Sequence, residues 1–204
     1  GVTGVSVAYT VLKMDAGPVV AQEEYALGED EAAPEALEEL FRRGTRMLLD
    51  ALPAALGLAE GGGFDAAAPQ DCSRATPADK IELAEGILRP RSQSAADCHS
   101  RCKAFAGWPG TRTTLEVVEG DVAEQLEVKV LATSRVAAPE GTAPGDVTVT
   151  KKAVVVTCAC GQGLRLLRLQ TPNKKPMDAA SFVNGLRGRQ LRVPEKADAH
   201  EPAA

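Results

Sequence analysis

The sequence predicts an α+β protein whose second half forms a small β-barrel. Between residues 113 and 169, five short apolar and β-branched runs alternate with turn residues. Apolar residues recur at helical spacing from 37 to 52, and a strand-like apolar run lies near the first residue. Five short strands at such spacing are typical of a closed or partly closed barrel. We therefore expect a unit of strands and one helix, followed by the barrel.

The first 58 residues predict two strands and an amphipathic helix. Val5–Val11 is apolar and β-branched, Lys13–Pro18 interrupts it, and Pro18–Tyr25 is a second extended run. Pro34 occupies the expected first helical position, and the helical spacing of apolar residues continues to about Pro53. The helix expected over 35–52 has one apolar face.

Residues 59–79 have the composition of a linker, since Ala, Gly, Pro and Asp dominate and large apolar side chains are few. A second helix is expected from Ser94, as the N-cap, to about Phe105, and a short closing helix is expected at 177–184. The expected strands are Thr113–Val118, Leu126–Ala132, Asp146–Thr150, Ala153–Cys158 and Leu164–Leu169.

Charge is distributed very unevenly along the 204 residues. The net charge of −5, taken alone, argues against a nucleic-acid partner, but residues 1–70 sum to −8 and residues 151–194 to +8. The basic stretch, residues 151–194, contains nine Lys and Arg residues and only one acidic residue, Asp178. A local excess of this size is expected of a surface that binds a polyanion, although a solvated basic face without a partner has the same composition.

Four motifs, in order along the chain, carry a family resemblance. They are Thr3–Gln22 (TGVSVAYTVLKMDAGPVVAQ), Ala75–Ile81 (ATPADKI), Arg101–Thr111 (RCKAFAGWPGT), and Leu169–Met177 (LQTPNKKPM) with Ala180–Gly185 (ASFVNG). The first resembles the last catalytic motif of formyltransferases that use 10-formyltetrahydrofolate. The other three resemble elements of the methionyl-tRNA formyltransferase family, and the third is closer in wording to plant and algal organellar versions.

The resemblance implies the C-terminal part of a Rossmann-like formyltransferase catalytic domain, then a linker and an OB-like barrel that binds tRNA. The implied boundaries are 1–58 for the catalytic remnant, 59–92 for the linker, 93–194 for the tRNA-binding domain and 195–204 for a disordered tail. The family's catalytic Asn and His, which lie upstream of the Asp motif, are not found here. We therefore expect a fragment in which the apolar face of helix 35–52 is exposed, because much of its sheet is missing.

By its place in the first motif, Asp15 matches the catalytic Asp of the family. The resemblance implies that this carboxylate orients a His during formyl transfer from 10-formyltetrahydrofolate, the co-substrate, to an amine. Gly17 would let the backbone approach the folate closely. Without the resemblance, residues 15–18 would be interpreted as a turn after a strand. Because the triad lacks two members, we expect the chain alone to be inactive.

The resemblance also implies initiator methionyl-tRNA as the partner of the barrel, held mainly through its phosphates. The candidate side chains are Lys151, Lys152, Arg168, Lys174, Lys175, Arg187 and Arg189. Aromatic residues are scarce, which argues against base stacking as the main source of affinity. Trp108 is the one stacking candidate, but we expect it to be a hydrophobic plug where the helix meets the barrel.

Cys98, His99 and Cys102 share a helix but lack a fourth zinc ligand, so buried reduced cysteines are expected and no metal. No apolar run reaches 18 residues, which excludes a membrane-spanning helix. We also expect the protein to be a monomer. The expected location is a mitochondrion or plastid, or the cytoplasm if the source is bacterial. Two alternatives stay open: a non-catalytic RNA-binding module, and a related folate-dependent sugar-nucleotide formyltransferase.

Overall fold

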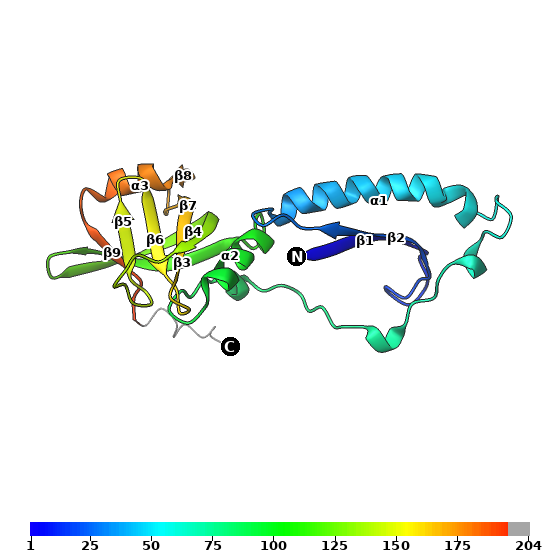
Figure 1. Ribbon diagram of the computed structural model, residues 1–204, viewed down its shortest axis with the longest axis horizontal. Helices are drawn as coiled ribbons and strands as arrows, with labels where there is room; N and C mark the ends of the chain where they lie inside the picture. The colour runs from blue at the N-terminus through cyan, green and yellow to red at the C-terminus, as the bar shows by residue number, and fades with distance from the viewer. Residues whose placement is uncertain (196–204) are drawn as a thin grey trace. The chain divides into compact units, whose positions relative to one another are not determined.

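The computed structural model describes residues 1–195 and divides at Lys80 into two compact units, Gly1–Lys80 and the residues from Ile81 onward (Figure 1). The division falls within the segment expected to be the linker. Of the expected tail, 195–204, all residues except Glu195 lie outside the described part. Among residues 1–195, no helix is long and apolar enough to cross a membrane.

The first unit consists of a two-stranded antiparallel sheet and one long helix. Strands β1 (Val2–Ala8) and β2 (Val19–Ala26) pair with Val5 opposite Glu23. Helix α1 (Ala33–Ala55) starts where the Glu35 carboxylate accepts a hydrogen bond from the Ala32 backbone N–H (3.2 Å). Both strands and the helix were expected, but β1 begins three residues early and α1 extends past Pro53, because a proline in the last turn removes only one backbone bond.

Helix α1 is fastened to the sheet at a few points along one face. Ala36 is its one buried residue, and Arg43 reaches across to the Glu23 carboxylate on β2 (2.6 Å). At Gly44 an added Cβ would lie only 2.8 Å from Val5 Cγ2, so a glycine is needed for this close approach of helix and strand. Since two strands cannot cover a helix of this length, most of its apolar residues stay exposed.

The segment between α1 and the barrel has three short 3₁₀ turns, η1 (Phe64–Ala66), η2 (Cys72–Arg74) and η3 (Leu83–Gly86). Its first part is tied to the sheet of the first unit, because Val19 and Ala68 exchange two backbone hydrogen bonds. Its last part is tied to the barrel, since Leu88 N–H donates to the Arg112 carbonyl (2.8 Å) and Arg91 donates to the Val193 carbonyl.

The second unit is built around one antiparallel sheet. Its strands are β3 (Thr111–Glu119), β4 (Val122–Ala137), β5 (Val147–Thr150), β6 (Ala153–Thr157), β7 (Gln162–Gln170), β8 (Met177–Asp178) and β9 (Gln190–Arg192). The order is β5-β6-β7-β4-β3-β9, with β8 also on β7. A bridge between Asp146 and Arg192 and a bond from Val193 N–H to the Gly145 carbonyl (3.0 Å) join the two edges, so the sheet is a nearly closed barrel, as expected.

The five expected strands are all present, with different ends. Strand β4 is 16 residues long, more than twice the expected run, because its first residues pair with β3 in a hairpin and its last residues, 133–137, pair with β7. Strands β8 and β9 were not expected, since two or three residues are too few to show a period of two.

Alternating residues of the strands fill the barrel, and two helices cover its ends. On β3, for example, Leu115 and Val117 point inward and are buried. Helix α2 (Ala95–Ala104) has Ser94 as its N-cap, whose Oγ accepts from Asp97 N–H (3.0 Å), which confirms the expected start. Helix α3 (Ala179–Leu186) buries Phe182 against the core. It is as long as the expected closing helix but begins and ends two residues later, because Met177 and Asp178 pair with β7 as strand β8.

Candidate functional site

Asp15 lies in the turn between β1 and β2. Its carboxylate is exposed, and its backbone is left-handed (φ 55°), a conformation that Asp tolerates better than most residues. The Gln70 side-chain amide holds this turn, because its Nε2 donates to the carbonyl oxygens of Asp15 (3.0 Å) and Gly17 (2.7 Å). Sequence reasoning missed Gln70, since nothing in a linker-like segment marks one amide as the partner of a distant turn.

Gly17 is buried at the end of the same turn. An added Cβ would collide with the Tyr9 carbonyl oxygen, so no other residue fits this backbone. The Tyr9 N–H in turn donates to the Pro18 carbonyl (3.0 Å) and closes the loop. The packing of the loop thus requires a glycine here, whereas an approach of Gly17 to folate stays a prediction.

The first unit supplies Asp15 with no imidazole partner, because residues 1–80 contain no histidine. His99 lies in the second unit, where it is buried and its Nδ1 is 2.9 Å from Thr133 Oγ1. What the turn offers by itself is therefore one exposed carboxylate on a backbone held in place by Gln70.

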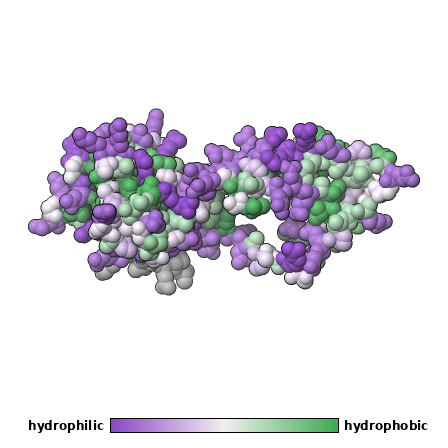
Figure 2. Space-filling view, in the orientation of Figure 1, coloured by the Kyte–Doolittle hydropathy of each residue, from purple (hydrophilic) through white to green (hydrophobic). Residues whose placement is uncertain are grey.

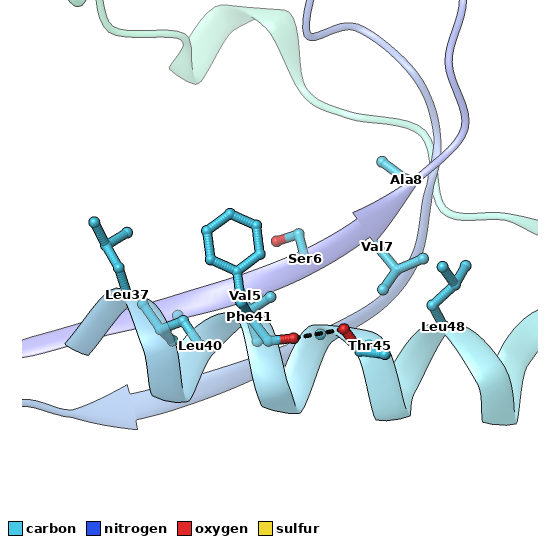
Figure 3. A pocket seen from close by; sticks show the side chains of 11 residues that line it. Val5, Ser6, Val7, Ala8, Leu37, Leu40, Phe41, Thr45 and Leu48 are labelled. Atoms are coloured by element: carbon cyan, nitrogen blue, oxygen red, sulfur yellow. Dashed lines mark hydrogen bonds between the residues drawn. The ribbon is translucent and has the colours of Figure 1, made fainter. Parts of the chain in front are cut away.

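An apolar groove of about 570 Å³ lies between β1 and α1. Figure 3 shows Leu37, Phe41 and Leu48 projecting from the helix beside the strand, with the Thr45 hydroxyl donating to the Phe41 carbonyl (2.8 Å). Phe41 is 75% exposed. In Figure 2, green hydrophobic residues are visible on this unit beside the purple polar ones. The expectation that the apolar face of this helix is exposed is thus confirmed.

Three of the predicted cations lie where β6 meets β7. Lys151 and Lys152 form the β5–β6 turn, and β6 runs beside β7 with Val154 opposite Leu166. Two residues further along β7, Arg168 is exposed and lies opposite Asp178 of β8. Strands β6 and β8 therefore follow each other along the same edge of β7, and Figure 1 shows α3 at this end of the barrel.

The other four cations lie in the loops that flank α3. Lys174 and Lys175 are in the β7–β8 loop, where Gln170 Nε2 donates to the Lys174 carbonyl (2.7 Å). Arg187 ends α3 in a left-handed conformation (φ 53°), and Arg189 Nε donates to the Leu186 carbonyl (3.0 Å). Lys174 and Arg189 line one pocket, and Arg187 and Arg189 line another.

None of these seven side chains forms an ion pair with a carboxylate among residues 1–195. Six of them are exposed and Arg189 is half-buried. By contrast, Arg192, on β9, is neutralised by Glu116 at 2.6 Å. Exposed cations without carboxylate partners are available to an anion from outside the chain.

The expectation that Cys98 and Cys102 are buried is confirmed. Cys98, Cys102 and Cys158 are buried in the barrel core, whereas Cys72 and Cys160 are exposed, and all five are free. Burial raises the pKa of the Cys102 thiol. In the part of the chain that the structure describes, no three metal-ligating side chains cluster.

The expectation for Trp108 is wrong. Its side chain is 62% exposed and fills no cavity, because the space where α2 meets the barrel is already occupied by Cys102 and Thr111, which both donate to the Val130 carbonyl. Trp108 lies outside, in the turn from Gly107 to Gly110. The indole of Trp108 is therefore open to solvent.

The family model for the formyl transferase C-terminal domain matches residues 80–187, which is more than half of the chain and begins where the second unit begins. The chain belongs to this formyl transferase family. It is 33% identical over 192 residues to the methionyl-tRNA formyltransferase of Methylococcus capsulatus (93% of this chain, 57% of that protein) and 31% identical over 184 residues to that of Sorangium cellulosum (90% and 55%). The similarity to methionyl-tRNA formyltransferases is thereby confirmed, and the chain spans little more than half of these relatives.

Two solved structures share the fold of this chain. HypX from Aquifex aeolicus in complex with tetrahydrofolic acid has a TM-score of 0.62 at 16% identity, covering 92% of this chain and 31% of HypX. The sugar 3N-formyl transferase WlaRD has a TM-score of 0.55 at 11% identity, covering 85% of this chain and 56% of WlaRD. At identities of 16% and 11%, these similarities establish a shared fold and nothing about function.

Proposed function

We propose that this chain is the C-terminal portion of a methionyl-tRNA formyltransferase, in which the turn at Asp15 belongs to the catalytic site and an OB-like barrel holds initiator methionyl-tRNA. The proposal rests on the seven cations around β7 and α3 that have no carboxylate partner among residues 1–195, in a chain similar to methionyl-tRNA formyltransferases over nine-tenths of its length. The Rossmann-like origin of residues 1–58 and the OB-like character of the barrel are part of the proposal.

The reaction proposed for the whole protein moves a formyl group from the nitrogen of 10-formyltetrahydrofolate to the amino group of the methionyl residue. The amine loses a proton and the folate nitrogen gains one, so a residue that holds a proton in transit is needed. The exposed Asp15 carboxylate can orient an imidazole and stabilise its protonated form. Gln70 acts behind it by fixing the backbone of the turn.

The first 80 residues hold one member of this machinery and no imidazole, so the isolated chain lacks most of the electrostatic stabilisation of the oxyanion. We expect no detectable formyl transfer by the purified 204-residue chain. Turnover with folate donor and charged initiator tRNA would contradict this.

The test of the binding function is the affinity of the full chain for initiator tRNA at several salt concentrations. Phosphate contacts release counterions, so the logarithm of the association constant should fall linearly with the logarithm of the salt concentration. An affinity that does not change with salt, or no binding at low salt, would contradict the proposal. If the chain belongs to a sugar-nucleotide formyltransferase, its affinity for tRNA should show no such salt dependence. If it is an RNA-binding module without catalysis, tRNA binding should depend on salt, but the full-length protein should not transfer a formyl group.

We place the protein in a mitochondrion or plastid, or in the cytoplasm of a bacterium. The only support for an organelle is the similarity of the sequence of residues 104–110 to plant and algal organellar versions. Expression of the natural gene with a fluorescent tag tests it.

A further inference from the structure

A pocket of about 400 Å³ lies on the barrel between α3, the β7–β8 loop and the β3–β4 hairpin. It is the place where two predicted cations, Lys174 and Arg189, come together with carboxylates from another element. Glu124 lies on β4, where it pairs opposite Val117 of β3. The pocket therefore has positive charge on one side, negative charge on the other and an apolar floor between them.

The floor is part of the hydrophobic core. Phe182 and Leu186, one turn apart on α3, are 5% and 4% exposed, and Val117 of β3 is 7% exposed. Met177 is half-buried and packs against the same core. Side chains fixed in this way offer a flat heterocycle van der Waals contact without having to be ordered first.

Thr171, at the end of β7, contributes an unsatisfied polar group to the pocket wall. It is 8% exposed, and its Oγ1 is buried with no hydrogen-bond partner among the described residues. Other buried threonines of the barrel are bonded: Thr111 Oγ1 donates to the Val130 carbonyl (2.7 Å) and Thr113 Oγ1 to the Leu88 carbonyl (3.1 Å). Buried polar groups seldom stay unpaired, and rotation about χ1 of Thr171 would direct its hydroxyl to a ligand.

From this arrangement we infer that the pocket binds one unpaired nucleotide of an RNA strand whose base carries an amino group. Lys174 and Arg189 bind the phosphate, the floor contacts the base, and the Glu124 carboxylate accepts a hydrogen bond from the amino group. Cytosine, adenine and guanine have such a group and uracil does not. The inference rests on the proposed function, since it names the part of the RNA that this face of the barrel takes.

Gly185 provides a variant that fills the pocket without disturbing the core. It lies on α3 in the pocket wall, and a Cβ added there meets no atom within 4 Å. Gly185→Leu therefore places a side chain in open space, and leucine favours a helix more than glycine does. Asn184→Leu, at the neighbouring exposed position outside the pocket, is the matched control.

The experiment measures the affinity of the full chain for two RNA tetranucleotides, all-cytidine and all-uridine, by fluorescence anisotropy. Because both carry the same phosphates, their difference isolates the base. We expect the cytidine oligomer to bind about five- to tenfold more tightly, and this preference to vanish in Gly185→Leu and in Glu124→Gln but to persist in Asn184→Leu. Circular dichroism of each variant verifies that it is folded.

Equal affinity of the natural chain for the two oligomers would overturn the inference, as would a preference that survives Gly185→Leu. Initiator tRNA titrated in the same series separates the two proposals. Salt-dependent tRNA binding without base preference leaves the proposed function standing and the pocket refuted. Base preference without tRNA binding supports the pocket and contradicts the tRNA function.

Discussion

Gln70 holds the turn that carries Asp15, since its side-chain amide donates to the Asp15 carbonyl oxygen at 3.0 Å and to that of Gly17 at 2.7 Å. Asp15 and Gln70 are 55 positions apart in the sequence, and Gln70 lies outside every helix and strand. A single amide thus fixes the backbone on which the proposed catalytic carboxylate is mounted.

Gln70→Ala should loosen this turn. Each lost hydrogen bond costs about 0.5–1.5 kcal/mol, so the Tyr9 amide, which closes the loop by donating to the Pro18 carbonyl, should exchange with solvent about tenfold faster. Hydrogen exchange measured by NMR tests this. Gln22→Ala is the control, because Gln22 bonds the Ser6 hydroxyl at an exposed site on the sheet. Unchanged exchange at Tyr9 in Gln70→Ala would show that the loop needs no such support.

The Lys174→Ala/Lys175→Ala double variant should bind initiator tRNA more weakly and with a flatter salt dependence. The slope of log affinity against log salt should fall by about one unit for each lost phosphate contact. Arg46→Ala/Lys80→Ala removes two exposed cations from the first unit and should leave the slope unchanged. If both double variants bind tRNA alike, the β7–β8 loop is not part of the tRNA surface.

Two of the five thiols should react quickly with a disulfide reagent at pH 8, and three only after unfolding. Cys72 and Cys160 are exposed. The pKa of Cys102 is raised by burial, and that of Cys98 is raised by a hydrogen bond with Cys158 and by burial, so neither forms the reactive thiolate. Absorbance counts the thiols, and Cys72→Ser/Cys160→Ser should remove the fast phase. A third fast equivalent would mean that the barrel core opens readily.

Helix α1 should lose stability in acid through Glu39. Hydrogen bonds from Arg42 and Arg43, both at 2.7 Å, lower the pKa of Glu39 to about 2. Because its folded pKa lies below the ordinary value of 4.5, the stabilisation is complete above pH 4.5 and is lost as the pH falls toward 2. The site is exposed, so the effect is small.

Urea unfolding followed by circular dichroism at 222 nm, at pH 2.5 and pH 6, measures this effect. Glu39→Gln should reduce the difference between the two pH values. Glu38→Gln, which removes an exposed neighbour without an ion pair among residues 1–195, should not. An equal pH dependence in Glu39→Gln and the natural chain would show that the Arg42 and Arg43 contacts contribute nothing to stability.

The apolar groove beside β1 should bind hydrophobic dyes. Phe41 lines it and is 75% exposed, so Phe41→Ser should lower the fluorescence of bound anilinonaphthalene sulfonate about twofold. Leu49→Ser removes a similarly exposed apolar residue of α1 outside the groove and should have a much smaller effect. Equal losses in the two variants would locate the dye elsewhere on the helix.

The sequence by itself determined the parts of this protein that depend on local order along the chain. The period of apolar residues predicted α1, and short apolar runs between turns predicted five barrel strands. Ser94, as a potential N-cap, predicted the start of α2, and its hydroxyl accepts from the Asp97 amide there. The four ordered motifs led to the formyl transferase family, which the match over residues 80–187 confirms. The roles of Asp15 and of the seven cations remain predictions.

Only the tertiary structure decided what depends on residues far apart in sequence. It joined Gln70 to the Asp15 turn, closed the barrel through the short strand β9, and left Trp108 exposed where a plug was expected. It also placed Lys174, Arg189 and Glu124 around one pocket with the unsatisfied hydroxyl of Thr171. Such contacts depend on packing and on strand register across the whole sheet. Composition and periodicity do not predict which side chains distant in sequence come into contact.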